Sequence, residues 1–281
     1  MIRAALVQMR SGRDVARNLA DASRLIRQAR AEGAQFVSTP EMTSILEPDR
    51  DRLRALARPE AEDGSVRHFS ALAQELAIWL NIGSLALMGP GGKLVNRSLL
   101  FAPDGTLAAR YDKIHLFDVD LPTGLSLRES EAYEGGSTAV LVQTAMAAIG
   151  LTICYDIRFP HLYRTLARAG ARLFTVPSAF TVPTGIAHWH VLLRARAIET
   201  GSFVLAAAQG GRHESGRETY GHSLIVSPWG EVLAEAGTEP GVIMADIDLS
   251  AADLARAQIP ALSHERAVEL SVLKPVSGIA T

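Results

Sequence analysis

Short apolar runs alternate with amphipathic helix-like segments, and this alternation constrains the fold of the chain most strongly. In the first helical segment, Asp14 suits the N-cap and Gly33 suits the helix end. In the N-terminal part we expect a strand over 2–9, a helix over 14–34, a strand over 35–41 that stops near Pro40, a helix over 66–81 and a strand over 82–88. Many short strands with fewer helices are typical of a layered α/β protein with mixed or antiparallel sheets.

The rest of the chain continues this pattern. Two apolar runs around Pro103-Asp104-Gly105 predict a hairpin within 97–113. We then expect helices over 159–171 and 187–201, and strands over 139–144, 147–154, 171–178, 202–209, 222–228, 230–236 and 241–249. No linker or change of composition divides the sequence, so we expect a single domain over 1–281, with an extended C-terminal arm from about residue 262 to 281.

Two long stretches, 43–65 and 114–137, follow neither the helical nor the strand pattern. Irregular segments of this length in a compact domain are often functional. We therefore expect these two stretches to contribute to a functional site.

Composition excludes several classes of protein. The 281 residues carry a net charge near −2 and give a pI of about 6.5, which argues against a nucleic-acid binder or a polybasic membrane anchor. A single cysteine excludes an internal disulfide framework and suits a reducing compartment. The N-terminus lacks the pattern of a signal peptide, and no apolar run is long enough to span a membrane. We expect a soluble cytoplasmic protein.

That single cysteine, Cys154, lies in the segment GLTICYDIRFP, where an apolar strand gives way to a helix that Pro160 can begin. A strand-to-helix turn projects its side chain over the end of a sheet, beside backbone N–H groups that can bind an oxyanion. The alternative is a buried structural cysteine, since free cysteine is among the most buried residue types.

A nucleophilic thiol needs a base and electrostatic support. Glu41 follows an apolar strand in STPEM, and Lys113, one of only three lysines, ends a hairpin strand in YDKIHLFD. Taken singly, each is more often a solvated surface charge. Because Cys154 also lies at a strand end, the three together indicate a candidate reactive centre.

Four segments, VSTPEMT, RYDKIHLFDVD, RESEAYEGG and GLTICYDIRFP, resemble in order and spacing the signature segments of the nitrilase-like carbon–nitrogen hydrolases. The resemblance covers essentially the whole chain. It implies a four-layer αββα sandwich, assembled as a homodimer or a higher homo-oligomer. It also implies a small-molecule amide as the substrate, with no metal or organic cofactor and no nucleic-acid or membrane partner.

The same resemblance implies a catalytic triad of Glu41, Lys113 and Cys154, with Glu129 orienting the substrate amide and supporting the lysine. The residue types suit amide hydrolysis, which needs a nucleophile, a proton donor and a charge stabiliser. Cys154 would attack the carbonyl carbon, and Glu41 would move the proton from the thiol to the leaving nitrogen. Lys113 and the backbone N–H of Tyr155 would hold the oxyanion, and Glu41 would then activate a water that hydrolyses the thioester.

The segment over 177–237 resembles the branch that contains deaminated glutathione amidase and omega-amidase, and its pieces over 187–200 and 206–223 resemble the former more closely. This likeness implies a γ-linked 2-oxoglutaryl amide as the substrate. Its keto-acid end would be bound by the side chains of Arg158, Phe180 and Thr184. For Arg158, a structural ion pair with Asp156 or Glu199 is the alternative.

Other interpretations remain open at this point. Within the family, the alternatives are an omega-amidase acting on 2-oxoglutaramate and an N-carbamoyl amino acid amidohydrolase. A catalytically silent scaffold of the same fold is the non-enzyme alternative. His188 and His190 do not suggest a metal site, because helical residues two apart point to different faces.

Overall fold

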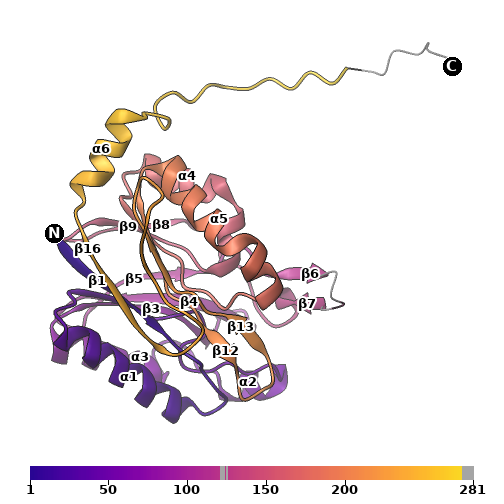
Figure 1. Cartoon of the computed structure of the whole chain (residues 1–281). Helices are drawn as coiled ribbons and strands as arrows, with labels where there is room; N and C mark the ends of the chain where they lie inside the picture. The colour runs from indigo at the N-terminus through magenta and orange to yellow at the C-terminus, as the bar shows by residue number, and fades with distance from the viewer. Residues whose placement is uncertain (121–123, 125, 274–281) are drawn as a thin grey trace, which may run out of the picture.

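In the computed structural model, which describes residues 1–120, 124 and 126–273, two six-stranded sheets stack face to face and helices cover both outer faces (Figure 1). This is the four-layer αββα sandwich expected from the sequence, and the prediction of fold class is confirmed.

The first sheet has the strand order β16-β1-β2-β3-β4-β5. Strands β1 to β3 are parallel, and β16, β4 and β5 run antiparallel to their neighbours. Helices α1 (Val15–Ala31) and α3 (Gly64–Leu76) pack on its outer face. The strands are β1 (Ile2–Gln8), β2 (Phe36–Ser38), β3 (Trp79–Met88), β4 (Leu94–Phe101), β5 (Leu107–Asp112) and β16 (Gly241–Ile247).

The second sheet has the order β15-β14-β11-β10-β9-β8, with β9, β10 and β11 parallel. Helices α4 (Pro160–Arg168) and α5 (Val182–Thr200) cover its outer face (Figure 1). The strands are β8 (Val140–Gln143), β9 (Ala148–Leu151), β10 (Leu173–Thr175), β11 (Phe203–Ala206), β14 (Leu224–Val226) and β15 (Val232–Glu235). The remaining described elements are α2 (Arg50–Leu56), β6 (Asp118–Asp120), β7 (Ser126–Arg128), η1 (Glu129–Glu131), η2 (Cys154–Arg158), β12 (Gly210–Arg212), β13 (Glu218–Tyr220) and α6 (Ser250–Gln258).

Strand β1 shows how the layers are held together. Its side chains alternate between the faces of the sheet with a period of two. Ala4 and Leu6 lie in the apolar cluster shared with the second sheet, whereas Ala5 and Val7 lie in the cluster formed with α1 and α3. All four are fully buried, so this strand is apolar on both faces, as a central strand between two packed layers must be.

The expected helix over 66–81 is wrong at its C-terminal end. Helix α3 stops at Leu76, and Ala77 turns the chain with a left-handed φ of 50°. Trp79 begins β3, whose first residues pair with β2. Glycine is the usual residue for this left-handed turn, so the alanine gave no sign of a helix end in the sequence.

The two stretches expected to be irregular contain short elements. Helix α2 lies within 43–65, where the Asp49 side chain caps it by accepting hydrogen bonds from Asp51 N and Arg52 N. Strands β6 and β7 and the turn η1 lie within 114–137. Helix α5 also begins at Val182, earlier than expected, with a proline in its first turn.

The chain continues beyond α6 without a described helix or strand, and Figure 1 shows it extending away from the sheets. The expected arm over 262–281 is therefore described as far as residue 273, and residues 274–281 lie outside the described residues. None of the helices in the described part of the chain has both the length and the apolar character needed to cross a membrane.

Gly83 allows three backbone segments to meet beneath the site. A Cβ built on it would lie 2.0 Å from the Thr39 carbonyl oxygen and 2.4 Å from Pro177 Cβ. Thr39 belongs to the segment that leads from β2 to Glu41, and the Pro177 carbonyl accepts a hydrogen bond from Cys154 N at 2.9 Å. Any side chain at this position would push apart the segments that carry the candidate base and nucleophile.

We predict that Gly83→Ala lowers the free energy of unfolding by about 3 kcal/mol, because the contacts that the new methyl group would make are with backbone and a proline ring. Urea denaturation followed by circular dichroism measures this change. Gly241→Ala is the matched control, since nothing lies within 4 Å of its added Cβ, and it should change stability by less than about 0.5 kcal/mol. Equal effects of the two substitutions would contradict the close-packing account.

Candidate active site

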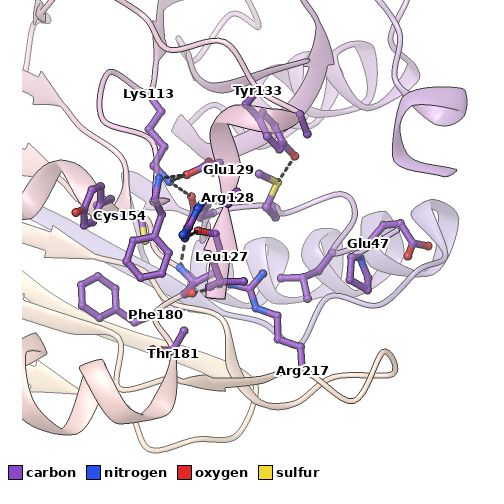
Figure 2. A pocket seen from close by; sticks show the side chains of 18 of the residues that line it. Glu47, Lys113, Leu127, Arg128, Glu129, Tyr133, Cys154, Phe180, Thr181 and Arg217 are labelled. Atoms are coloured by element: carbon purple, nitrogen blue, oxygen red, sulfur yellow. Dashed lines mark hydrogen bonds and ion pairs between the residues drawn. The ribbon is translucent and has the colours of Figure 1, made fainter. Parts of the chain in front are cut away.

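Four predicted residues meet in one pocket of about 240 Å³ (Figure 2). Glu41 comes shortly after β2, Lys113 directly follows β5, Glu129 begins η1, and Cys154 begins η2. The pocket is thus lined by segments that are far apart in the sequence. Glu41 and Lys113 follow strands of the first sheet, and Cys154 follows a strand of the second.

Cys154 lies at the turn that the sequence predicts, although β9 ends three residues earlier than expected, at Leu151. Its backbone is left-handed, with a φ of 49°, an uncommon conformation for a non-glycine residue. The hydrogen bond from its N–H to the Pro177 carbonyl holds the turn in place. The side chain is 7% exposed, so the thiol is buried but still lines the pocket.

Asp156 fixes this turn from within. One of its carboxylate oxygens accepts hydrogen bonds from Tyr111 OH at 2.7 Å and from Ile153 N at 2.9 Å. The other contacts His115 N at 3.1 Å and His115 Nδ1 at 2.7 Å. Because Tyr111 and His115 flank Lys113 in the chain, this fully buried carboxylate joins the nucleophile turn to the lysine segment.

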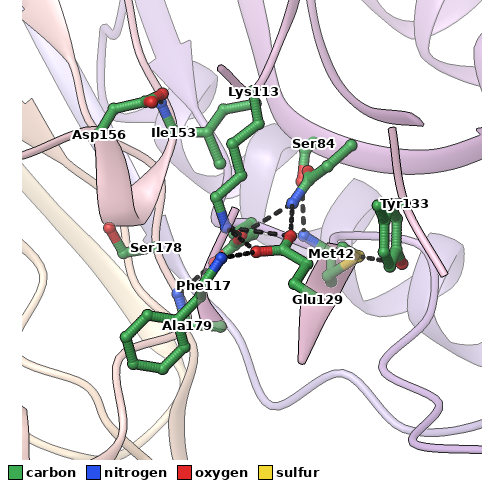
Figure 3. Close-up of polar contacts among 12 residues, drawn as sticks. Met42, Ser84, Lys113, Phe117, Glu129, Tyr133, Ile153, Asp156, Ser178 and Ala179 are labelled. Carbon is green, nitrogen blue, oxygen red and sulfur yellow. Dashed lines mark hydrogen bonds and ion pairs between the residues drawn. The ribbon is translucent and has the colours of Figure 1, made fainter. Parts of the chain in front are cut away.

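Lys113 lies at the centre of a buried charge cluster (Figure 3). Its Nζ donates to Glu41 Oε1 at 3.0 Å, and to Glu129 Oε1 and Oε2 at 3.1 and 2.8 Å. The lysine is 2% exposed and Glu41 is 5% exposed. One ammonium therefore faces two carboxylates, of which Glu41 is buried and Glu129 keeps 13% of its side chain exposed.

Other groups satisfy the remaining carboxylate lone pairs. Asn96 Nδ2 donates to Glu41 Oε1 at 2.9 Å and to Glu129 Oε1 at 3.2 Å. The backbone N–H of Ala179 donates to Glu41 Oε2 at 2.9 Å, and that of Phe117 donates to Glu129 Oε2 at 2.7 Å. The sequence analysis missed Asn96. No distinct sequence signal marks it, because Asn96 is followed in strand β4 by two other polar residues, Arg97 and Ser98.

These surroundings define the protonation states. Burial opposes ionisation of Glu41, but the charge of Lys113 and hydrogen bonds from Cys154, Lys113 and Asn96 outweigh it and lower the pKa of Glu41. Burial also opposes the charge on Lys113, yet Glu129 and Glu41 raise the pKa of this lysine. Burial, followed by the negative charge of Glu41, raises the pKa of the Cys154 thiol. The resting site therefore holds a neutral thiol beside a carboxylate and an ammonium.

The three residues expected to bind the keto-acid end, Arg158, Phe180 and Thr184, all line this pocket. The Arg158 guanidinium carbon lies 5.7 Å from the Phe180 ring centroid and 5.9 Å from that of Tyr155. The alternative prediction for Arg158, an ion pair with Asp156 or Glu199, is wrong. Asp156 has the partners described above, and Glu199 pairs with Arg196 at 2.9 Å.

His188 and His190 have different partners, as expected from their helical spacing. His188 Nδ1 lies 3.2 Å from an Arg158 nitrogen, whereas His190 Nε2 lies 2.9 Å from Glu235 Oε1. Among the described residues, one set has a spacing that could hold a metal ion, and it lies outside the pocket: His190, His222 and Glu235, with ligand atoms within 4.8 Å of one another.

Further charged residues reach the pocket from the two long stretches. Arg50 pairs with Glu131. Arg128 Nη2 donates to both carboxylate oxygens of Asp120, each at 2.8 Å. The sequence analysis named the stretches that hold these residues but not the residues themselves. The pocket residues missed from the sequence include Glu47, Arg50, Arg128, Tyr133 and Arg217.

The chain is similar to known proteins over nearly its whole length. The family model for carbon–nitrogen hydrolases matches residues 3–257. The chain is 40% identical over 266 residues to a deaminated glutathione amidase of Synechocystis, covering 93% of this chain and 97% of the relative. It is 38% identical over 264 residues to the omega-amidase NIT2 of Bos taurus, covering 94% and 95% of the two chains.

The structure of the NitFhit protein of Caenorhabditis elegans is also similar, with a TM-score of 0.88 and 37% sequence identity. That similarity covers 94% of this chain and 65% of the longer NitFhit chain. The chain therefore belongs to the carbon–nitrogen hydrolase family, as an enzyme of the branch that holds deaminated glutathione amidases and omega-amidases.

Proposed function

We propose that this enzyme is a deaminated glutathione amidase, which hydrolyses a γ-linked 2-oxoglutaryl amide to 2-oxoglutarate and cysteinylglycine. The observation that carries the proposal is the meeting of Cys154, Glu41, Lys113 and Glu129 in one pocket. The name of the Synechocystis relative, at 40% identity over nearly the whole chain, supports this choice of substrate.

In the first step, the Cys154 sulfur attacks the amide carbonyl carbon and Glu41 accepts the thiol proton. The protonation states favour this assignment, because a neutral thiol lies beside an ionised carboxylate. A glutamate whose pKa is lowered is a weak base in isolation. Its proximity to the thiol offsets this, since the proton moves only as the carbon–sulfur bond forms.

Lys113 and the backbone N–H of Tyr155 stabilise the oxyanion. An ammonium has three N–H donors, and here Nζ faces three carboxylate oxygens. Since two of those oxygens belong to Glu129, one contact can be exchanged for the oxyanion while Glu129 stays bound to the lysine. Glu129 then orients the ammonium and accepts a hydrogen bond from the substrate amide.

Collapse of the tetrahedral intermediate breaks the carbon–nitrogen bond. Glu41 gives its proton to the leaving nitrogen, and the acyl group remains on Cys154 as a thioester. Glu41, again ionised, takes a proton from a water that attacks the thioester carbonyl. The second tetrahedral intermediate releases 2-oxoglutarate and returns the proton to the thiol.

The keto-acid end of the substrate lies against Arg158, Phe180 and Thr184 in this proposal. The Arg158 guanidinium is held over two aromatic rings, which leaves its planar edge for a carboxylate. Thr184, whose hydroxyl lies 2.8 Å from that of Thr181, adds a hydrogen-bonding group to the lining of the same pocket.

An omega-amidase acting on 2-oxoglutaramate is the second candidate, because the bovine relative of that name is nearly as similar. Both reactions would use the same triad and the same keto-acid contacts. They differ in the leaving group, which is ammonia for the omega-amidase and a dipeptide for the proposed reaction.

We also propose that the chain is a single cytoplasmic domain that forms a homodimer or a higher homo-oligomer. Helix α5 leaves Ile186 70% exposed and Val191 68% exposed beside its buried Trp189. An apolar outer face of this kind supports association. Analytical ultracentrifugation tests it, and a monomer at micromolar concentration would exclude it.

We predict a higher kcat/KM for deaminated glutathione than for 2-oxoglutaramate, with 2-oxoglutarate detected by a coupled dehydrogenase. Cys154→Ala should lower kcat by roughly 10⁴-fold or more with both substrates, because it removes the nucleophile. The variant should keep the circular dichroism spectrum of the wild type. Preference for 2-oxoglutaramate would assign the omega-amidase reaction instead, and an active Cys154→Ala variant would refute the mechanism.

We predict that kcat/KM is nearly flat from about pH 6 to 9 and falls only in acid. Glu41 must be ionised, and because its pKa is lowered from 4.5, the active form is lost only as the pH falls through that lower value. Discontinuous assays measure the profile, with circular dichroism as the check for acid unfolding. A tenfold rise in rate per pH unit through neutrality would instead indicate a thiolate that must form before substrate binds.

A further inference from the structure

Four arginines line the pocket, and they differ in how their charge is balanced. Arg50 and Arg128 have carboxylate partners in Glu131 and Asp120. Within the part of the chain that the structure describes, Arg158 and Arg217 have no salt-bridge partner. Guanidinium groups remain charged at any ordinary pH and fit carboxylates well. Two positive charges are thus available to a bound molecule.

Arg217 is connected to the reacting groups through a single residue. Its terminal nitrogen donates to the Ala179 carbonyl at 3.1 Å, and the Ala179 N–H donates to Glu41 at 2.9 Å. Figure 2 shows Arg217 reaching in from the side of the pocket away from Cys154. One hydrogen bond to a carbonyl leaves four of its five N–H donors for other partners.

The hairpin that carries Arg217 is held firmly. His213, at the start of the loop between β12 and β13, is buried, with ring nitrogens 2.9 Å from the Ser11 carbonyl and 2.7 Å from the Thr219 hydroxyl. The Glu214 side chain accepts a hydrogen bond from Arg13 N at 3.1 Å. An arginine on an anchored loop loses less conformational freedom when it binds a ligand.

The proposed substrate has a carboxylate at each end. Arg158 accounts for the one beside the keto group, and the terminal carboxylate of the leaving cysteinylglycine still needs a partner. We propose that Arg217 binds this terminal carboxylate and so selects amides with a dipeptide leaving group over amides that release ammonia. This inference rests on the proposed function, because the leaving group is part of that assignment.

The test combines changes in enzyme and substrate. Wild type and Arg217→Gln are assayed with deaminated glutathione, with its C-terminal carboxamide, and with 2-oxoglutaramate. For deaminated glutathione, Arg217→Gln should lower kcat/KM by about 10- to 100-fold, mostly through KM. The other two substrates lack the terminal carboxylate, so their kcat/KM should change by less than about twofold. The matched control Arg212→Gln, at an exposed arginine of the same hairpin, should change none of the three.

Arg217→Lys keeps the charge and should recover part of the lost kcat/KM for deaminated glutathione alone. Equal losses on all three substrates would show that Arg217 acts only by holding Ala179, and no loss on any would show that it does not bind substrate. Either result overturns the inference while the proposed function stands. A wild type that cleaves 2-oxoglutaramate but not deaminated glutathione would overturn both.

Discussion

The site depends on keeping Lys113 and two carboxylates charged while they are shielded from water. Transfer of each ion from water costs several kcal/mol, so the cluster is tolerable only if nearly every donor and acceptor is paired. Asn96 Nδ2 and two backbone N–H groups supply further donors to the carboxylates, whereas Asn96 Oδ1 has no hydrogen-bond partner among the described residues. The cluster carries a net charge of about −1, counted from two carboxylates and one ammonium. Burial and then the negative charge of Glu41 raise the pKa of the Cys154 thiol and disfavour a resting thiolate. In the proposed mechanism, proton transfer to Glu41 therefore accompanies attack.

The stacked sheets supply the rigidity that this cluster needs. The parallel strands β9, β10 and β11 end beneath the site, and the segment after each one makes a contact there. Cys154 follows β9, Ala179 follows β10, and Gln209 follows β11, where its side chain donates to the Glu41 carbonyl at 3.0 Å. Cys154 and two of the contacts that hold Glu41 therefore come from segments that follow neighbouring strands of one sheet, which fixes their relative positions.

Local chemistry explains what could be predicted from the sequence. Cys154 was found because an apolar strand followed by Pro160 predicts a turn, and Glu41 and Lys113 because charged residues at strand ends match the family segments. Asn96 and Arg217 were missed, since their roles arise from contacts between distant segments that no periodicity records. The error in the predicted helix over 66–81, which ends at Leu76 in the structure, has the same origin. The apolar run through Trp79 suits either a helix or a strand, and pairing with β2 decides between them.

The left-handed backbone at Cys154 means that stability and the proposed chemistry favour different residues at this position. For a residue with a Cβ, that conformation costs about 1–2 kcal/mol, whereas glycine adopts it without this cost. A search for variants that resist heat would thus favour glycine here and would remove the proposed nucleophile. In the proposed mechanism turnover requires the thiol, so selection for stability and selection for activity act in opposite directions here.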